Sequence, residues 1–234
     1  MHMSSSTQYY DKASDSYEAI SASKSFYIAH IDSFIINQAR THQAREWLDV
    51  GSGDGKRLVS IIPHVTPDIR LTVVEPSPKM LRLSKESLSH LGERVQYSQC
   101  SIEQFGANQK YDFITCLWNV IGHSTEPLRF MQAIRSVKTP GGVVIFDCNN
   151  SFNISQYGTD AMKNIIRSLI RPRDILSFTL RLDEIKTTVK ILNPHQVLLL
   201  LKQAGFTTYE FRYVSYQTGR SASKLSGQML ILAK

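Results

Sequence analysis

A glycine-rich turn directly after a short apolar run limits what this chain can fold into. The run 47–50, Trp-Leu-Asp-Val, leads into the turn 51–55, Gly-Ser-Gly-Asp-Gly, and apolar residues at helical spacing follow up to Pro63. Glycine at every second position lets backbone amides approach a ligand that a side chain would block. The pattern therefore predicts a strand, a turn and a helix, with a nucleotide-type ligand at the turn.

The same alternation of short strands and helices continues to residue 146. Residues 1–24 are rich in serine and tyrosine with few aliphatic residues, so we expect a loose arm there that ends in the start of a helix. Alternating elements predict an α/β fold, a mostly parallel sheet with helices on both faces. We expect strands at 71–74, 95–97, 111–117 and 143–146, and helices at 26–40, 78–91 and 127–137.

Residues 151–190 interrupt this alternation. An amphipathic piece at 161–170 precedes an alternating stretch at 177–189, which is typical of an antiparallel strand or hairpin. A helix then begins at Asn193-Pro194 and ends at Gly205, before strands at 207–213 and 228–233. We interpret the chain as one domain, 1–234: N-terminal arm and helix (1–45), cofactor-binding core (46–150), lid insertion (151–190), and C-terminal helix and strands (191–234).

Composition narrows the class of protein. The 234 residues contain no uninterrupted apolar stretch of about 18, so we expect a soluble, unexported, cytoplasmic protein with no membrane partner. The three cysteines, an odd count at wide spacing, predict neither a disulfide framework nor a metal site. The net charge of +7 lies entirely in residues 151–234, which carry 12 basic and 5 acidic residues. An anionic substrate, a nucleic acid or an ordinary solvated surface would each account for it.

The spacing of the glycines distinguishes between nucleotide cofactors. The dinucleotide fingerprint has its third glycine one position after Gly55, where this chain has Lys56. Glu75 lies 24 residues after Gly51, at the end of the second predicted strand, where a carboxylate accepts hydrogen bonds from both ribose hydroxyls. Without a pyrophosphate to bind, the turn fits the amino-acid end of S-adenosylmethionine better than NAD.

With these elements in order, the sequence resembles the class I, Rossmann-like superfamily of S-adenosylmethionine-dependent methyltransferases, of the small-molecule type. The resemblance implies a seven-stranded, mostly parallel sheet in the order 3-2-1-4-5-7-6, in which 228–233 would be the reversed seventh strand. Segments 47–55 and 73–76 resemble the family's first two motifs, 100–105 its adenine-binding segment, 111–117 its fourth strand, 138–142 the turn before its fifth, and 204–206 its closing helix and strand.

The resemblance implies a set of residues that bind S-adenosylmethionine and its product S-adenosylhomocysteine. Within this set, Asp49 would bind the cofactor's ammonium through water or fix the loop, and Ser101 stands where the family usually has an aspartate that meets the adenine amine. The implied residues are Asp49, Gly51, Ser52, Gly53, Gly55, Glu75, Pro76, Ser101, Ile102, Glu103, Leu117 and Trp118.

Catalysis and acceptor binding are expected near the segment after the fourth strand, at the carboxyl edge of the sheet. His123 is the candidate base, because its imidazole titrates near neutral pH, although a structural histidine is equally common there. Tyr10 and Tyr17 resemble tyrosines that many small-molecule members fold over the sulfonium. Candidate substrate residues are Asn119, Asn149, Arg167 and Arg171.

The sequence indicates least about the methyl acceptor. Base-modifying members carry an Asn/Asp-Pro-Pro-aromatic signature after the fourth strand, and this chain has Leu-Trp-Asn-Val at 117–120. We therefore expect methylation at nitrogen or oxygen of a small molecule, with an anionic acceptor as one option, by a monomer or homodimer. An RNA-modifying methyltransferase and a catalytically inactive cofactor-binding subunit stay open as alternatives.

Overall fold

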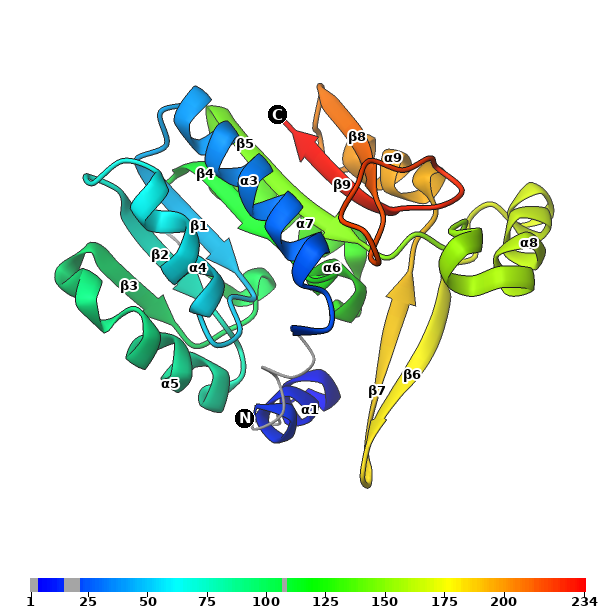
Figure 1. The fold of residues 1–234 in the computed structure, drawn as a ribbon, viewed down its shortest axis with the longest axis horizontal. Helices are drawn as coiled ribbons and strands as arrows, with labels where there is room; N and C mark the ends of the chain where they lie inside the picture. The colour runs from blue at the N-terminus through cyan, green and yellow to red at the C-terminus, as the bar shows by residue number, and fades with distance from the viewer. Residues whose placement is uncertain (1–3, 15–21, 107–108) are drawn as a thin grey trace.

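A seven-stranded sheet forms the centre of the molecule. The structure, a computed structural model, describes residues 4–14, 22–106 and 109–234. The strand order in the sheet is β3-β2-β1-β4-β5-β9-β8 (Figure 1). The strands are β1 (Glu46–Val50), β2 (Arg70–Val74), β3 (Val95–Ser98), β4 (Tyr111–Cys116), β5 (Lys138–Cys148), β8 (Tyr209–Val214) and β9 (Gln228–Ala233).

One strand of this sheet is reversed, as predicted. β9 pairs antiparallel with both β5 and β8, whereas β1, β2, β3, β4 and β5 pair in parallel. Counted along the chain within this sheet, β8 is the sixth strand and β9 the seventh. The expected α/β class, with a mostly parallel sheet, is therefore confirmed.

Helices cover both faces of the sheet, and each face has its own apolar core. Because successive side chains of a strand point to opposite faces, Trp47 packs into one core and its neighbour Leu48 into the other. On the Trp47 face lie α3 (Ser25–Thr41), α4 (Lys56–Ile61) and α5 (Pro78–Ser87). On the opposite face lie α6 (Val120–His123), α7 (Pro127–Val137) and α9 (Pro194–Gln203).

The short 3-10 helices connect these elements. They are η1 (Ile62–His64), η2 (Ser89–Arg94) and η3 (Ile102–Gln104). The helix expected at 78–91 ends earlier, at Ser87, and η2 continues from it with Gly92 at φ +57°. The C-terminal helix begins as predicted, because Asn193 and Gln196 form a capping box at the start of α9.

The N-terminal residues form a helix, so the expected loose arm is wrong for the described part. α1 (Ser5–Ala13) begins after Ser4, whose side chain accepts a hydrogen bond from the Thr7 amide. α1 packs against α5 and the hairpin strand β7. Asp11 accepts a hydrogen bond from the Ser77 hydroxyl, and Lys12 pairs with Asp183. Apolar periodicity did not predict this helix, because polar side chains make these contacts with the rest of the protein. Tyr17 lies outside the described residues.

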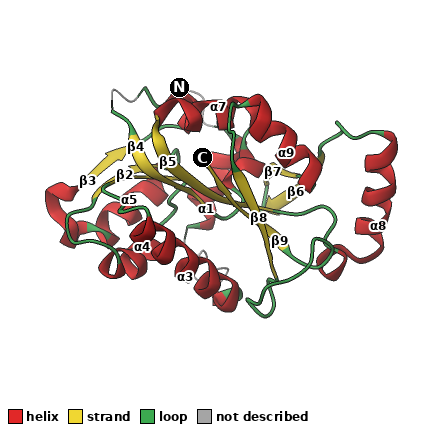
Figure 2. Ribbon diagram, turned by 90° about the horizontal axis from the view of Figure 1, so that it is seen from above, coloured by secondary structure: helices red, strands yellow, loops and turns green. Residues whose placement is uncertain are grey.

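The insertion at 151–190 divides into two parts. α8 (Ile154–Ile170) projects from one end of the molecule, as Figures 1 and 2 show. β6 (Leu176–Leu182) and β7 (Ile185–Ile191) form the expected antiparallel hairpin, and β7 packs against α1 and α6. The hairpin, and not α8, is therefore the part of the insertion that reaches the carboxyl edge of the sheet.

Two other expectations concern membranes and cysteines. None of the helices that the structure describes has the length and hydropathy to cross a bilayer. Cys100, Cys116 and Cys148 are free thiols, and the last two are buried in β4 and β5, as their sequence surroundings predicted.

Candidate cofactor site

The glycine turn after β1 needs glycine for both conformational and steric reasons. Gly51, Gly53 and Gly55 have φ of +71°, +58° and +73°, in the region that side chains disfavour. A Cβ on Gly51 would lie 2.6 Å from Cγ2 of Val120, and one on Gly55 would lie 2.8 Å from Oγ of Ser84. At Gly51 and Gly55 the turn therefore packs too tightly against Val120 and Ser84 to accept a side chain, and we call this turn the cradle.

Glu75 braces this cradle from the neighbouring strand. Because β1 and β2 are in parallel register, the segments after Val50 and Val74 meet at one edge of the sheet. One carboxylate oxygen of Glu75 accepts the Gly53 amide at 3.0 Å, and the other accepts the Ser77 amide at 2.9 Å. Burial raises the pKa of Glu75 to about 7, and the two amide donors oppose that shift. Each oxygen keeps a further lone pair for a ligand hydroxyl.

Asp49 is held by the protein itself. Its carboxylate accepts the Ser52 hydroxyl at 2.5 Å and also the Thr115 hydroxyl, which in turn accepts the indole N–H of Trp47 at 2.6 Å. Burial raises the pKa of Asp49, and these hydroxyl donors lower it. These contacts fit the expected role of Asp49 in fixing the loop, and binding of the cofactor's ammonium by Asp49 stays a prediction.

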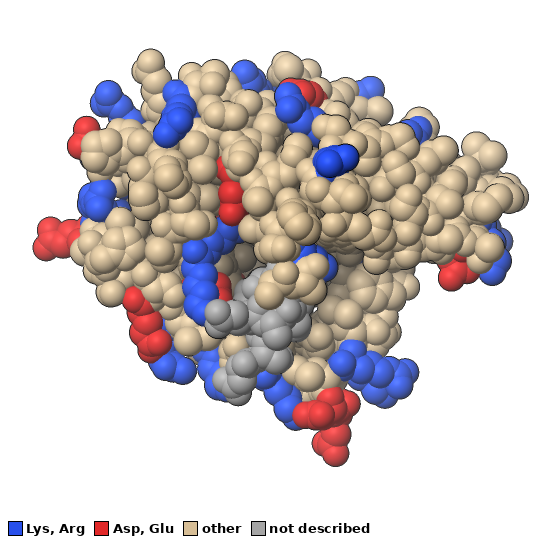
Figure 3. Space-filling view, viewed as in Figure 1, with Lys and Arg blue, Asp and Glu red and all other residues tan. Residues whose placement is uncertain are grey.

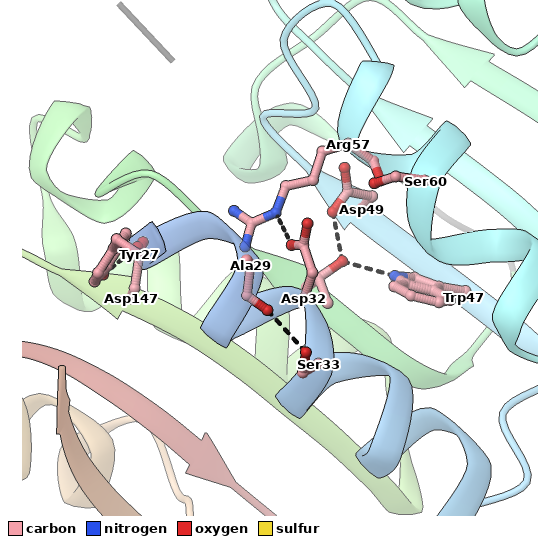
Figure 4. A network of polar contacts seen from close by, with 10 residues as sticks. Tyr27, Ala29, Asp32, Ser33, Trp47, Asp49, Arg57, Ser60 and Asp147 are labelled. Carbon is pink, nitrogen blue, oxygen red and sulfur yellow. Dashed lines mark hydrogen bonds and ion pairs between the residues drawn. The ribbon is translucent and has the colours of Figure 1, made fainter. Parts of the chain in front are cut away.

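A half-buried arginine behind the cradle pairs with one acidic residue and acts through its charge on two others. Nε of Arg57, on α4, donates to Asp32 on α3 at 2.5 Å (Figure 4). Burial raises the pKa values of Asp32, Asp49 and Asp147, and the charge of Arg57 lowers all three. Both terminal nitrogens of Arg57 are buried without a partner among the described residues. The sequence pattern did not predict a role for Arg57. The available signal was that a charged residue interrupts the apolar pattern of a predicted helix.

Replacing Arg57 with methionine should therefore destabilise the protein by about 2 kcal/mol at pH 7. This lies below the roughly 3–5 kcal/mol typical of broken buried pairs, because the pair with Asp32 is partly exposed. The pKa values of the three acids should rise, so the loss should shrink as the pH falls and they protonate. Urea unfolding at pH 5 and pH 7 measures this, with Arg70→Met, on an exposed pair, as control. Equal losses at both pH values would contradict this electrostatic role.

The turn after β4 is strained and tied to β5. Trp118 and Asn119 have φ of +68° and +56°. The Asn119 amide donates to Asp147 at 2.8 Å, and its side-chain oxygen accepts the Asn149 amide at 3.0 Å. The side chain of Asn149 accepts the Tyr216 hydroxyl at 3.0 Å. Asn119 and Asn149, both expected to contact substrate, thus make structural contacts with the chain.

A lysine missed by the sequence reasoning lies beside this turn. Nζ of Lys24 lies 4.8 Å from the centroid of the Trp118 ring and 4.6 Å from that of Tyr216. Burial lowers the pKa of Lys24, and the nearby Asp147 carboxylate opposes that shift. A cation between two aromatic rings could bind an anionic group. Lys24 lies in the segment expected to be a loose arm, so its position in the sequence did not mark it as a binding residue.

His123 holds helix α1. Nε2 of His123 lies 2.9 Å from the Tyr10 hydroxyl and Nδ1 lies 3.1 Å from the Ser6 hydroxyl, so both ring nitrogens meet α1. The Tyr10 and His123 rings pack edge to face, with centroids 5.1 Å apart. Burial lowers the pKa of His123 to about 4, so the imidazole is neutral at pH 7. The structure thus brings the candidate base and one predicted tyrosine together.

The segment expected to bind adenine follows β3 and includes the short helix η3. Ser101 is the N-cap residue of η3, Ile102 is buried, and Glu103 accepts the Ser124 hydroxyl at 2.8 Å. Pro76 is half-buried after β2, and Leu117 is buried after β4. These predicted residues follow the ends of adjacent parallel strands, which explains why residues distant in sequence share one edge.

A cavity of about 240 Å³ opens beside the glycine turn. Its lining includes Gly51, Ser52, Leu117 and Trp118 of the predicted set, together with Arg57. The predicted substrate residues Arg167 and Arg171 lie elsewhere, on and just after α8, where Arg167 pairs with Asp174 at 3.3 Å. The role of 151–190 as a lid stays a prediction, and in this structure α8 lies away from the glycine turn, because amphipathic periodicity does not tell which surface a helix faces.

Comparisons with known proteins find similarity to methyltransferases. Residues 48–144 match a family model described as a methyltransferase domain. The chain is 26% identical to a ubiquinone biosynthesis O-methyltransferase of Aromatoleum aromaticum over 72% of this chain and 67% of that protein. The corresponding protein of Nitrosospira multiformis is 25% identical over 74% and 66%. The chain therefore spans about two thirds of the length of these relatives.

A solved structure shares the fold. The 1,6-didemethyltoxoflavin-N1-methyltransferase of Burkholderia thailandensis superposes with a TM-score of 0.66 over 98% of this chain and 86% of that one, at 14% identity. That structure holds bound 1,6-didemethyltoxoflavin and S-adenosylhomocysteine. At this identity the likeness shows the fold.

Proposed function

We propose that this chain belongs to the class I, Rossmann-like superfamily of S-adenosylmethionine-dependent methyltransferases and moves a methyl group to a nitrogen or oxygen atom of a small molecule. One observation carries the cofactor half of this proposal. A glycine turn too tight for side chains is braced by Glu75, whose buried carboxylate keeps free lone pairs toward the same edge. Relatives named as O-methyltransferases and a structural neighbour named as an N-methyltransferase support either acceptor atom.

The residues present fit S-adenosylmethionine. When bound, the cofactor supplies a sulfonium methyl group that is already activated for transfer. Glu75 would accept hydrogen bonds from the ribose hydroxyls, and the turn at 51–55 would place backbone amides near the amino-acid end. Ser101 would accept a hydrogen bond from the adenine amine next to the buried side chain of Ile102. Asp49 acts through Ser52 and Thr115, by fixing the turn.

We assign to the residues near the acceptor mainly the alignment of acceptor and methyl donor, and only a small part in removing a proton. An imidazole with a pKa of about 4 is a weak base at neutral pH, so His123 gains little as a general base. Its two hydrogen bonds instead hold α1, and with it Tyr10, over the edge of the sheet. A helix held in this position excludes water and keeps the methyl donor and the acceptor in line. Lys24, between its two rings, is the cation we assign to an anionic acceptor group.

Replacing Tyr10 with phenylalanine should lower kcat about tenfold, because α1 loses one of its two side-chain bonds to His123 while the ring contact persists. Release of S-adenosylhomocysteine with a metabolite mixture as acceptor measures the rate. Tyr9→Phe, one residue away on the same helix, is the matched control. An unchanged kcat would contradict the alignment role of α1.

The pH profile separates alignment by His123 from general base catalysis. With saturating cofactor, the pH profiles of kcat for the wild type and for His123→Ala should have the same shape near pH 6.5, since the folded-state pKa of His123 is about 4. A fall in kcat below pH 6.5 that is present in the wild type and absent from His123→Ala would mean that His123 is the base. Strongly salt-dependent tRNA binding would favour the RNA-modifying alternative, and tight cofactor binding without turnover would favour the inactive subunit.

A further inference from the structure

Helix α8 carries an apolar face that no other part of the described chain covers. Met162, Ile166, Leu169 and Ile170 are 54%, 60%, 80% and 75% exposed, whereas Ala161 on the same helix is fully buried. At 100° per residue these four side chains fall on one side of the helix. Contiguous exposed apolar surface of this kind is uncommon on soluble proteins and marks a contact surface.

A row of basic side chains borders this apolar face. Lys163, Arg167 and Arg171 follow one another at spacings of four residues, so they form a single stripe. A surface groove is lined by this stripe together with Ile166 and Ile170, so basic and apolar side chains meet there. Exposed ion pairs join Lys163 to Asp160 and the two arginines to Asp174, and such pairs are weak in water. The segment 154–174 holds four basic and two acidic residues.

The position of α8 leaves this surface accessible. The helix projects from the end of the molecule farthest from β3, away from the sheet (Figures 1 and 2). In the space-filling view this end is mostly uncharged, with charged side chains gathered along its lower edge (Figure 3). A broad, flat partner could therefore contact α8 without meeting the rest of the protein.

We propose that α8 binds the surface of an anionic lipid membrane, with its apolar face at the boundary of headgroups and acyl chains and its basic stripe among the phosphates. An amphipathic helix with basic residues beside an apolar face has this chemistry. Charge complementarity favours it over a second copy of the chain, since two copies packed through α8 would bring the basic stripes toward one another. The proposal is independent of the methyltransferase activity.

This surface departs from the expectation of no membrane partner. That expectation rests on the absence of a long apolar stretch, which tests for a span through the bilayer. A helix that lies on a membrane needs only one apolar face, so its polar residues interrupt every run in the sequence. The exposure of Leu169 and Ile170 is evident only once the fold is known.

Sedimentation with lipid vesicles tests the proposal on the full chain. The wild type should bind vesicles that contain phosphatidylglycerol at least about tenfold more strongly than vesicles of phosphatidylcholine alone, and added salt should weaken the binding. The variant Leu169→Glu/Ile170→Glu should lose about tenfold or more of this binding. Leu199→Glu, an exposed leucine 43% accessible on α9, is the matched control and should bind as the wild type does.

Each other outcome overturns the proposal. A wild type that ignores anionic vesicles, or binds both vesicle types equally, excludes an anionic lipid surface. Undiminished binding by the double variant, with an unfolding midpoint like that of the wild type, places the lipid contact elsewhere. A concentration-dependent dimer that Leu169→Glu/Ile170→Glu dissociates, without vesicle binding, assigns the face to a second copy of the chain.

Discussion

Replacing Gly51 with alanine is expected to destabilise the protein by about 3 kcal/mol and to remove measurable cofactor binding. The positive φ of +71° costs a side-chain-bearing residue about 1–2 kcal/mol. The new Cβ would also lie 2.6 Å from Cγ2 of Val120, and overpacking of this kind costs about 1–3 kcal/mol. Relieving the clash must move the turn or α6, and either movement reshapes the cradle. Urea unfolding and titration calorimetry measure the two losses.

Two further variants separate strain from collision. Gly205 has φ of +87°, and a Cβ added there would have nothing within 4 Å, so Gly205→Ala should show the strain alone, about 1 kcal/mol, with normal cofactor binding. Val120→Ala in the Gly51→Ala background removes the two methyl groups nearest the new Cβ and should restore part of the binding. A Gly51→Ala protein that binds cofactor as well as the wild type would contradict the role of the turn.

Replacing Glu75 with glutamine is expected to weaken S-adenosylmethionine binding by about a hundredfold. Hydrogen bonds to a charged group contribute about 1.5–3 kcal/mol, and glutamine replaces one acceptor oxygen with a donor. The wild-type dissociation constant should also rise about tenfold between pH 8 and pH 6, because the carboxylate with a pKa of about 7 becomes protonated. In Glu75→Gln this pH dependence should vanish, as calorimetry at both pH values would show. If it persists, another group binds the ribose.

The same carboxyl makes stability depend on pH. Its folded-state pKa of about 7 lies above the ordinary glutamate value of 4.5, so the folded protein holds the proton more tightly than the unfolded chain. The resulting stability is fully present below pH 4.5 and is lost as the pH rises through about 7, a change of about 3 kcal/mol. Asp49 and Asp147 have raised pKa values too, so the difference between wild type and Glu75→Gln isolates the Glu75 contribution.

The sequence was sufficient for the sheet and for much of the cradle. Strands alternating with helices are a regular pattern, and the glycine turn with Glu75 lies on consecutive elements, whose order follows from the chain. Asn193 and Gly205 likewise placed α9 to within a residue or two, because caps act locally. Local rules work where a residue's role is decided by its neighbours in sequence.

The contacts around the site depend on packing between distant segments and could not be predicted in that way. Lys24 meets rings that follow β4 and β8, and Arg57 meets α3. His123 meets α1, a helix that apolar periodicity did not predict. The amphipathic pattern of α8 is evident in the sequence, but the direction of this helix depends on how the chain leaves β5. The periodic pattern therefore predicted the helix but not that Arg167 and Arg171 lie away from the glycine turn.

Titration calorimetry of the wild-type chain with S-adenosylmethionine and, separately, with NAD tests the central claim most directly. We expect saturable binding of S-adenosylmethionine, competition by S-adenosylhomocysteine, and no heat of binding with NAD, because the turn at 51–55 has Lys56 where a dinucleotide site has its third glycine. Binding of NAD without binding of S-adenosylmethionine would contradict this assignment of the cofactor.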